Sequence, residues 1–131
     1  HCENGMAVAA FLESHEKVEC VHYCGLASDP YHARAEKYLP NGSCGVVSFE
    51  LKGGRDAACR FMKALKLAAI ETHVADARTC CLCPSASTHR QMSEEQLAAA
   101  GIPAGLVRIP CGLEGAADLI ADIAQALEAV N

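Results

Sequence analysis

Short strand-like runs alternate along the chain with longer helix-like runs, and this alternation most constrains the fold. The helical runs place hydrophobic residues three or four positions apart, whereas the strand-like runs are rich in β-branched and aromatic residues. Helices are expected at 3–14, 29–38, 57–65, 93–101 and 116–130, with strands or extended segments at 18–23, 45–51, 67–74, 79–83 and 106–109. The pattern predicts an α/β protein, more narrowly a two-layer α+β sandwich. In such a sandwich a small sheet has helices packed on one face.

The 131 residues are the length of one domain, and we expect residues 1–131 to form a single domain. The net charge of −5 and the scattered Lys and Arg residues argue against a nucleic-acid partner. No apolar run reaches the roughly 20 residues of a membrane span. The first residues, HCENGM, lack a signal-peptide pattern and an initiator Met. We therefore expect a cytoplasmic location and a chain trimmed from a longer one.

Arg108 is the residue that most suggests binding chemistry. It lies inside the apolar run LVRIPCG, where an unpaired charge is costly to bury. The guanidinium group matches a carboxylate or phosphate through two parallel hydrogen bonds. An anion-binding role and an internal ion pair with an acid such as Asp76 both remain open.

Nine cysteines are many for a chain without a secretory signal. Two groups have the residue types of a soft-metal site for Zn, Cu or Cd. These candidates are Cys80, Cys81 and Cys83 before a proline, and Cys20, His22 and Cys24 along one strand-like run, with Cys111 as a further thiol. Inert thiols and disulfides are the alternatives, and neither spacing is that of a standard zinc knuckle.

Five segments together carry a resemblance to a known family. They read HCENGMAVAAFLESH, KYLPNGSCGVVSFELKGG, LKLAAIETHVADARTC, STHRQMSEEQLAAAG and GLVRIPCGLEGAADLIADIAQALEA. Nearly end to end, the chain resembles the C-terminal domain of the O-acetylhomoserine sulfhydrylases, in the Cys/Met-metabolism family of pyridoxal-phosphate (PLP) enzymes. The resemblance implies the small domain of an aminotransferase-like, fold-type-I enzyme, in which helices cover a small, mostly antiparallel sheet.

What the resemblance implies about function is specific. The complete enzymes replace the acetate of O-acetylhomoserine at the γ-carbon by sulfide or a thiol, forming homocysteine or methionine in methionine biosynthesis. Arg108 would bind the α-carboxylate of this small amino-acid substrate, and the segment 72–76 with His73 would lie near substrate and cofactor. The lysine that holds PLP belongs to a large domain without counterpart here. We therefore expect no catalytic residue, no bound PLP and no competence in this chain alone, while a homo-oligomer remains open.

The departures from the family pattern converge on cysteine. The family usually has histidine at Cys83, proline at Cys24 and S-V-G at 110–112, and Cys20, Cys59 and Cys81 also occupy positions where a thiol is unexpected. A second hypothesis is therefore a stand-alone thiol-rich protein that keeps the fold and binds soft metals. A structural or oligomerisation module is the third.

Overall fold

The computed structural model describes residues 1–130. The helices are α1 (Cys2–Glu13), α2 (His32–Tyr38), α3 (Gly54–Ala64), α4 (Glu94–Ala99) and α5 (Ala116–Glu128), with a 3₁₀ turn, η1, at Pro84–Ala86. The strands are β1 (Val18–His22), β2 (Val46–Leu51), β3 (Ala69–Ile70), β4 (Cys80–Cys81) and β5 (Leu106–Pro110). Helices and strands follow one another largely as the sequence pattern predicts.

The sheet has an antiparallel centre with a small parallel extension. Strands β1, β2 and β5 pair in that order, all antiparallel, whereas β3 and β4 pair in parallel. The two parts are joined because the backbone of Leu82 exchanges both hydrogen bonds with that of Arg108, at 2.8 and 2.9 Å. The expected small, mostly antiparallel sheet is thereby confirmed.

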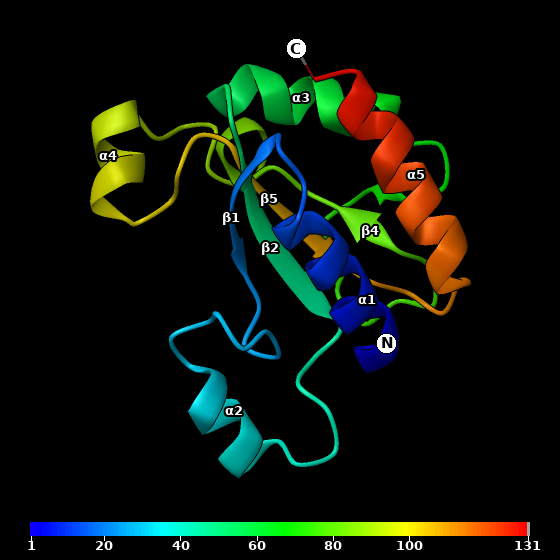
Figure 1. Cartoon of the computed structure of the whole chain (residues 1–131). Helices are drawn as coiled ribbons and strands as arrows, with labels where there is room; N and C mark the ends of the chain where they lie inside the picture. The colour runs from blue at the N-terminus through cyan, green and yellow to red at the C-terminus, as the bar shows by residue number, and fades with distance from the viewer. Residues whose placement is uncertain (131) are drawn as a thin grey trace.

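Three helices cover one face of this sheet. Helices α1 and α3 pack directly on the strands, and α5 packs against both of these helices (Figure 1). In the core between them the rings of Phe49 and Phe61 meet edge to face, with centroids 5.6 Å apart at 89°. Their burial supplies a large share of the hydrophobic stabilisation of this layer.

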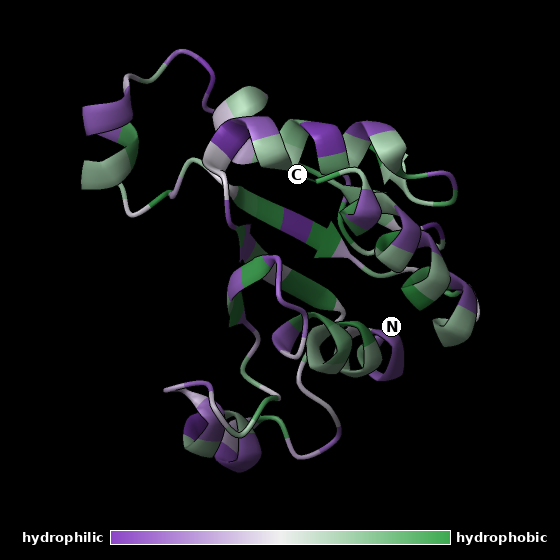
Figure 2. Ribbon diagram, turned by 45° about the horizontal axis from the view of Figure 1, so that its top comes forward, coloured by the Kyte–Doolittle hydropathy of each residue, from purple (hydrophilic) through white to green (hydrophobic). Residues whose placement is uncertain are grey.

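Strand β2 shows how the sequence separates the two faces. Val47, Phe49 and Leu51 are buried under the helices, whereas the alternating Ser48 and Glu50 are only half-buried on the opposite face. Successive side chains of a strand point to opposite faces, so an alternating sequence produces one apolar and one polar face. Figure 2 shows the same pattern as hydrophilic residues set singly among hydrophobic ones on the strands.

Some element boundaries differ from the expectation. Helix α2 begins only at His32, because the Asp29 carboxylate accepts a hydrogen bond from the Tyr31 N–H (2.8 Å) and closes a turn before the helix. The segment expected to be extended over 67–74 forms a strand only at β3. The capping box of Ser93 and Gln96 is confirmed at the start of α4. Among residues 1–130, no helix has the length and apolarity needed to cross a membrane.

Candidate functional site

The chemistry-bearing side chains gather on the sheet face that the helices leave uncovered. We call this the open face and define it by Cys20, His22, Ser48, Glu50 and Arg108. The strand register aligns them in two rows, with Cys20 opposite Glu50, and Ser48 opposite both His22 and Arg108. Residues from three strands thus meet on one surface.

Arg108 lies at the middle of β5. Its Nη2 donates a hydrogen bond to the Thr72 carbonyl oxygen (2.9 Å). Its Nε is buried and has no hydrogen-bond partner among the described residues. A buried donor without an acceptor costs about 1–3 kcal/mol. The Thr72 carbonyl thus holds the guanidinium group while its Nε–H still lacks an acceptor.

The ion pair between Arg108 and Asp76, one of the two alternatives that the sequence leaves open, does not form within residues 1–130. The Asp76 carboxylate instead lies 3.7 Å from His73 Nδ1 and accepts a hydrogen bond from the Arg78 N–H. The internal-pair alternative is therefore wrong for this partner, which leaves an external anion as the acceptor to consider for the guanidinium.

The segment 71–76 approaches Arg108 through its backbone rather than through His73. The His73 ring is exposed and lies 3.1 Å from the Glu71 carboxylate, whereas the neighbouring Thr72 carbonyl contacts Arg108. Ala75 has a φ of 59°, and no other non-glycine residue of the described chain has a positive φ. Such strained backbone is found preferentially where a loop serves a ligand. The structure thus places His73 next to Thr72, the backbone partner of Arg108, and no hydrogen bond joins His73 to Arg108 among the described residues.

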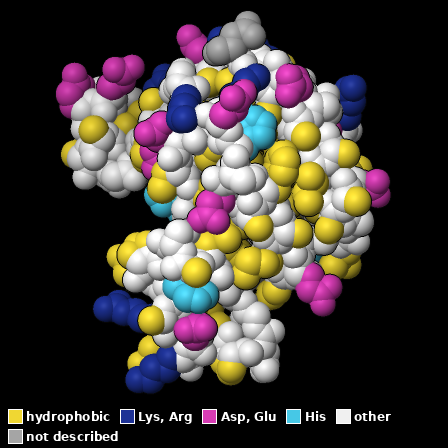
Figure 3. Space-filling model, in the orientation of Figure 1, with side chains coloured by type: hydrophobic (Ala, Val, Ile, Leu, Met, Phe, Trp, Pro, Cys, Tyr) yellow, Lys and Arg dark blue, Asp and Glu magenta, His cyan; other side chains and the backbone are white. Residues whose placement is uncertain are grey.

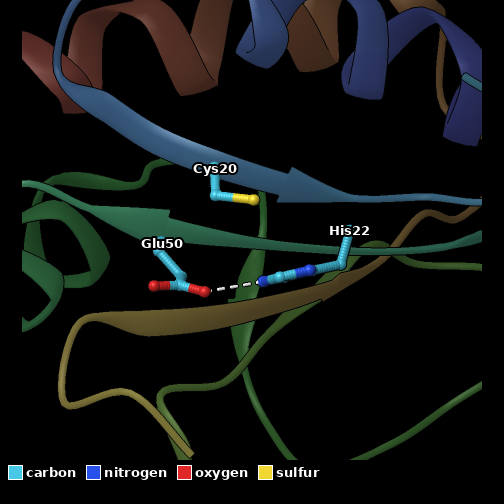
Figure 4. Close-up of side chains that lie close together, drawn as sticks. All are labelled: Cys20, His22 and Glu50. Atoms are coloured by element: carbon cyan, nitrogen blue, oxygen red, sulfur yellow. Dashed lines mark hydrogen bonds and ion pairs between the residues drawn. The ribbon is translucent and has the colours of Figure 1, made fainter. Parts of the chain in front are cut away.

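Cys20, His22 and Glu50 form a compact group on the open face (Figure 4). The Sγ, imidazole and carboxylate ligand atoms all lie within 4.8 Å of one another, and His22 Nε2 is 2.7 Å from Glu50 Oε1. Cys24 was predicted to belong to this group, but β1 ends at His22 and Cys24 lies in the following turn. Glu50 was not predicted, since only the pairing of β1 with β2 brings its carboxylate next to Cys20 and His22.

The other predicted thiol ligands do not converge. Cys80, Cys81, Cys83 and Cys111 are all buried, and the last three belong to the hydrophobic core. Burial raises the pKa of Cys111 to about 12 and raises that of Cys81 as well, so both thiols stay protonated near neutral pH. Within residues 1–130 they contribute to no group of three metal ligands. They behave as small core hydrophobes.

The surface beside the open face is hollowed. Helices α2 and α4 project on one side, and the space-filling outline is concave between them (Figure 3). A hollow of about 500 Å³ adjoins Cys20 and His22 and is closed by residues of the turn that precedes α2. A second hollow, of about 310 Å³, lies between His22, Glu50 and Leu106. Both hollows give small molecules or ions access to the open face.

Comparison with known proteins relates this chain to a family of enzymes. The family model described as Cys/Met metabolism PLP-dependent enzyme matches residues 1–128. The chain is 44% identical over 128 residues to homocysteine synthase of Schizosaccharomyces pombe, covering 98% of this chain and 30% of that protein. It is 42% identical over 129 residues to L-methionine gamma-lyase of Pseudomonas putida, covering 98% and 32%.

A solved structure agrees in fold. It is a crystal structure assigned as an O-acetylhomoserine (thiol)-lyase of Campylobacter jejuni, which carries N'-pyridoxyl-lysine-5'-monophosphate. The two structures superpose with a TM-score of 0.90 at 39% identity, over 98% of this chain and 30% of the other. The chain therefore spans about a third of the length of the relatives that it matches. From these matches, the chain belongs to the Cys/Met metabolism PLP-dependent enzyme family.

Proposed function

We propose that this chain is the C-terminal domain of an O-acetylhomoserine sulfhydrylase-like enzyme. The complete enzyme would replace the γ-acetoxy group of O-acetylhomoserine by sulfide, releasing acetate and forming homocysteine. Support comes from the relatives named homocysteine synthase and O-acetyl-L-homoserine sulfhydrylase, and from the third of their length that the chain spans. Relatives named L-methionine gamma-lyase are nearly as similar, and all these names imply an amino-acid substrate.

The observation that carries the proposal is the geometry of Arg108. Its guanidinium group is positioned by the Thr72 carbonyl, is free of any ion pair within residues 1–130, and keeps a buried Nε–H without an acceptor. A substrate α-carboxylate would accept two charge-assisted hydrogen bonds from this guanidinium group. In the proposed mechanism Arg108 binds and orients the amino acid, and the loop with His73 borders it.

The residues present do not fit the attachment of PLP, the family's cofactor and its electron sink when bound. Of the five lysines, Lys17 donates from Nζ to the Leu127 carbonyl and Lys52 to the Glu16 carbonyl, while Lys37 stacks on Tyr38. No lysine lines the hollow between His22 and Leu106 or the hollow beside Val74 and Pro110. No chemical step through the cofactor is assigned to this chain.

This assignment predicts how the isolated chain responds to PLP. Added at stoichiometric concentration, PLP should react weakly and with several exposed lysines rather than with one. Absorbance in the Schiff-base band, followed by borohydride reduction and peptide mapping, measures this. One stoichiometric lysine adduct with sulfhydrylase turnover would contradict the proposal.

A chimera tests the function itself. The aligned residues of the S. pombe homocysteine synthase are replaced by this chain, and homocysteine formation from O-acetylhomoserine and sulfide is measured, with methionine cleavage assayed in parallel. We expect turnover with the wild-type chain and a drop in kcat/KM of about 10- to 100-fold for Arg108→Lys, the scale of a lost charge-assisted pair.

The matched control is Arg34→Lys on α2, where the guanidinium stacks on Tyr31 away from the sheet. It should leave kcat/KM unchanged. A PLP-loaded chimera that cleaves methionine but makes no homocysteine would indicate a γ-lyase in place of a sulfhydrylase. A loaded chimera in which Arg108→Lys has no effect would remove Arg108 from the substrate site.

A further inference from the structure

The local shape of β1 places Cys20 on the open face. Val18 and Cys20 are two residues apart, and in a regular strand both side chains would point to the same face. The pairing with β2 is irregular between them, and Val18 is buried while Cys20 is exposed. Such bulges commonly re-aim a side chain. The irregularity brings the thiol across from Glu50 and beside His22.

The three side chains offer one sulfur, one nitrogen and one oxygen ligand from a rigid pair of strands. Zn²⁺ takes such donors with bonds of about 2.0–2.3 Å, which puts the ligand atoms roughly 3.3–3.8 Å apart. The three ligand atoms lie within 4.8 Å of one another, and the 2.7 Å between His22 Nε2 and Glu50 Oε1 is shorter than that range. Metal binding therefore requires these two ligand atoms to move apart.

The surroundings favour a cation. Glu13, Glu19 and Asp29 line the hollow next to Cys20, and neither this hollow nor the one beside Glu50 is lined by a lysine or arginine. Arg108, two strands away, is the cation of the open face and is tied to Thr72. Negative charges without a paired cation raise the local concentration of a divalent ion.

We infer that Cys20, His22 and Glu50 form a binding site for one Zn²⁺ ion, with the fourth position open to water or another small ligand. On binding, the Cys20 thiol releases its proton and becomes the thiolate ligand. The His22 ring carries its proton on Nδ1 and binds through Nε2, so the hydrogen bond to Glu50 is replaced by two metal bonds. This site is independent of the proposed enzymatic function and needs no PLP.

The test uses the fully reduced 131-residue chain, with Co²⁺ as the spectroscopic probe and Zn²⁺ as its competitor. We expect one equivalent of Co²⁺ to bind with a thiolate-to-cobalt charge-transfer band, and Zn²⁺ to displace it. Cys20→Ser should abolish the band, and both it and Glu50→Gln should weaken binding more than about tenfold. Cys20→His should retain binding without the band, which separates loss of a ligand from loss of the fold.

Two controls match the ligands in type. Cys2 is the other exposed cysteine of the chain, and half-buried His32 pairs with exposed Glu36 at 3.6 Å without belonging to a group of three metal ligands among the described residues. Cys2→Ser and His32→Gln should leave the affinity unchanged. A wild-type chain that binds no stoichiometric Co²⁺ would overturn the inference. So would a Cys2→Ser variant that loses the band as completely as Cys20→Ser.

Discussion

The two faces of the same three-stranded sheet differ in what they contribute. Under the helices, Phe49 and Ile109 are completely buried in contact with apolar neighbours. On the open face, Glu50, which follows Phe49, and Arg108, which precedes Ile109, carry charge and stay accessible. A strand that alternates apolar and polar residues packs into the core with one face and presents polar side chains on the other.

The comparison separates residues that hold the fold from residues that meet ligands. It also explains why the cysteines divide into two groups, because Cys81 and Cys111 lie with the core whereas Cys20 lies on the open face. Changes on the helix-covered face should therefore act on stability. Changes on the open face should act on binding.

The largest effect is expected for Phe49→Ala. This substitution opens a cavity under α3 and removes the edge-to-face contact with Phe61, so the free energy of unfolding should fall by about 3–5 kcal/mol. Urea denaturation followed by circular dichroism measures it. Ser48→Ala, the preceding residue on the open face, is the control and should change stability by less than about 0.5 kcal/mol. Equal losses of unfolding free energy in both variants would contradict the distinction between the two faces.

A pH effect of intermediate size should come from the helix layer. Burial alone would raise the pKa of Asp122, but N–H groups of Lys66, Ala68 and Leu67 donate to its carboxylate and together hold the pKa below the usual value. The ionised form therefore stabilises the fold above the ordinary Asp pKa near 4, and this contribution is lost as pH falls through the lowered native pKa.

Accordingly, Asp122→Asn should lower the free energy of unfolding at pH 7 by about 1–3 kcal/mol, and the difference from wild type should shrink toward pH 3. Urea denaturation at several pH values measures the two curves. Glu128→Gln, exposed at the end of the same helix, should follow the wild-type curve within about 0.5 kcal/mol. Parallel curves for Asp122→Asn and wild type would show that this carboxylate does not carry the pH dependence.

The smallest stability effect is expected for Arg108 itself. Arg108→Ala removes one hydrogen bond to Thr72 but also removes a buried donor without a partner, so stability should change by no more than about 1 kcal/mol. Arg108→Met keeps part of the apolar stem and should be closer still to wild type. A loss above about 3 kcal/mol in both variants would make Arg108 a structural residue of the sheet.

Much of the fold was predictable because it follows from local chemistry. The Ser93–Gln96 capping box and the alternation of β2 need no information from distant residues. The start of α2 was predicted wrongly, since the Asp29 side chain satisfies a turn N–H as well as it would a helix N–H. Where a side chain can make an equally strong hydrogen bond in a turn and in a helix, the local sequence does not determine where the helix begins.

The candidate site was only partly predictable, because strand register is a long-range property. The sequence indicates that Cys20 and His22 share a face, but the carboxylate opposite them depends on how β1 pairs with β2, irregularity included. Arg108 was recognised from its apolar surroundings, whereas its contact with the Thr72 carbonyl requires a segment 36 residues away to fold back onto β5. Burial of Cys81 and Cys83 likewise depends on packing under the helices.

The most direct test of the role of Arg108 is a coupling measurement in the chimera. The wild-type and Arg108→Ala proteins are each assayed with O-acetylhomoserine and with its α-carboxamide, which has no carboxylate to pair with the guanidinium. We predict that wild type prefers the acid strongly and that Arg108→Ala loses most of this preference, a coupling of about 2–3 kcal/mol or roughly 30- to 150-fold in kcat/KM. An equal preference for the acid in both proteins would contradict the assignment of Arg108 to the substrate carboxylate.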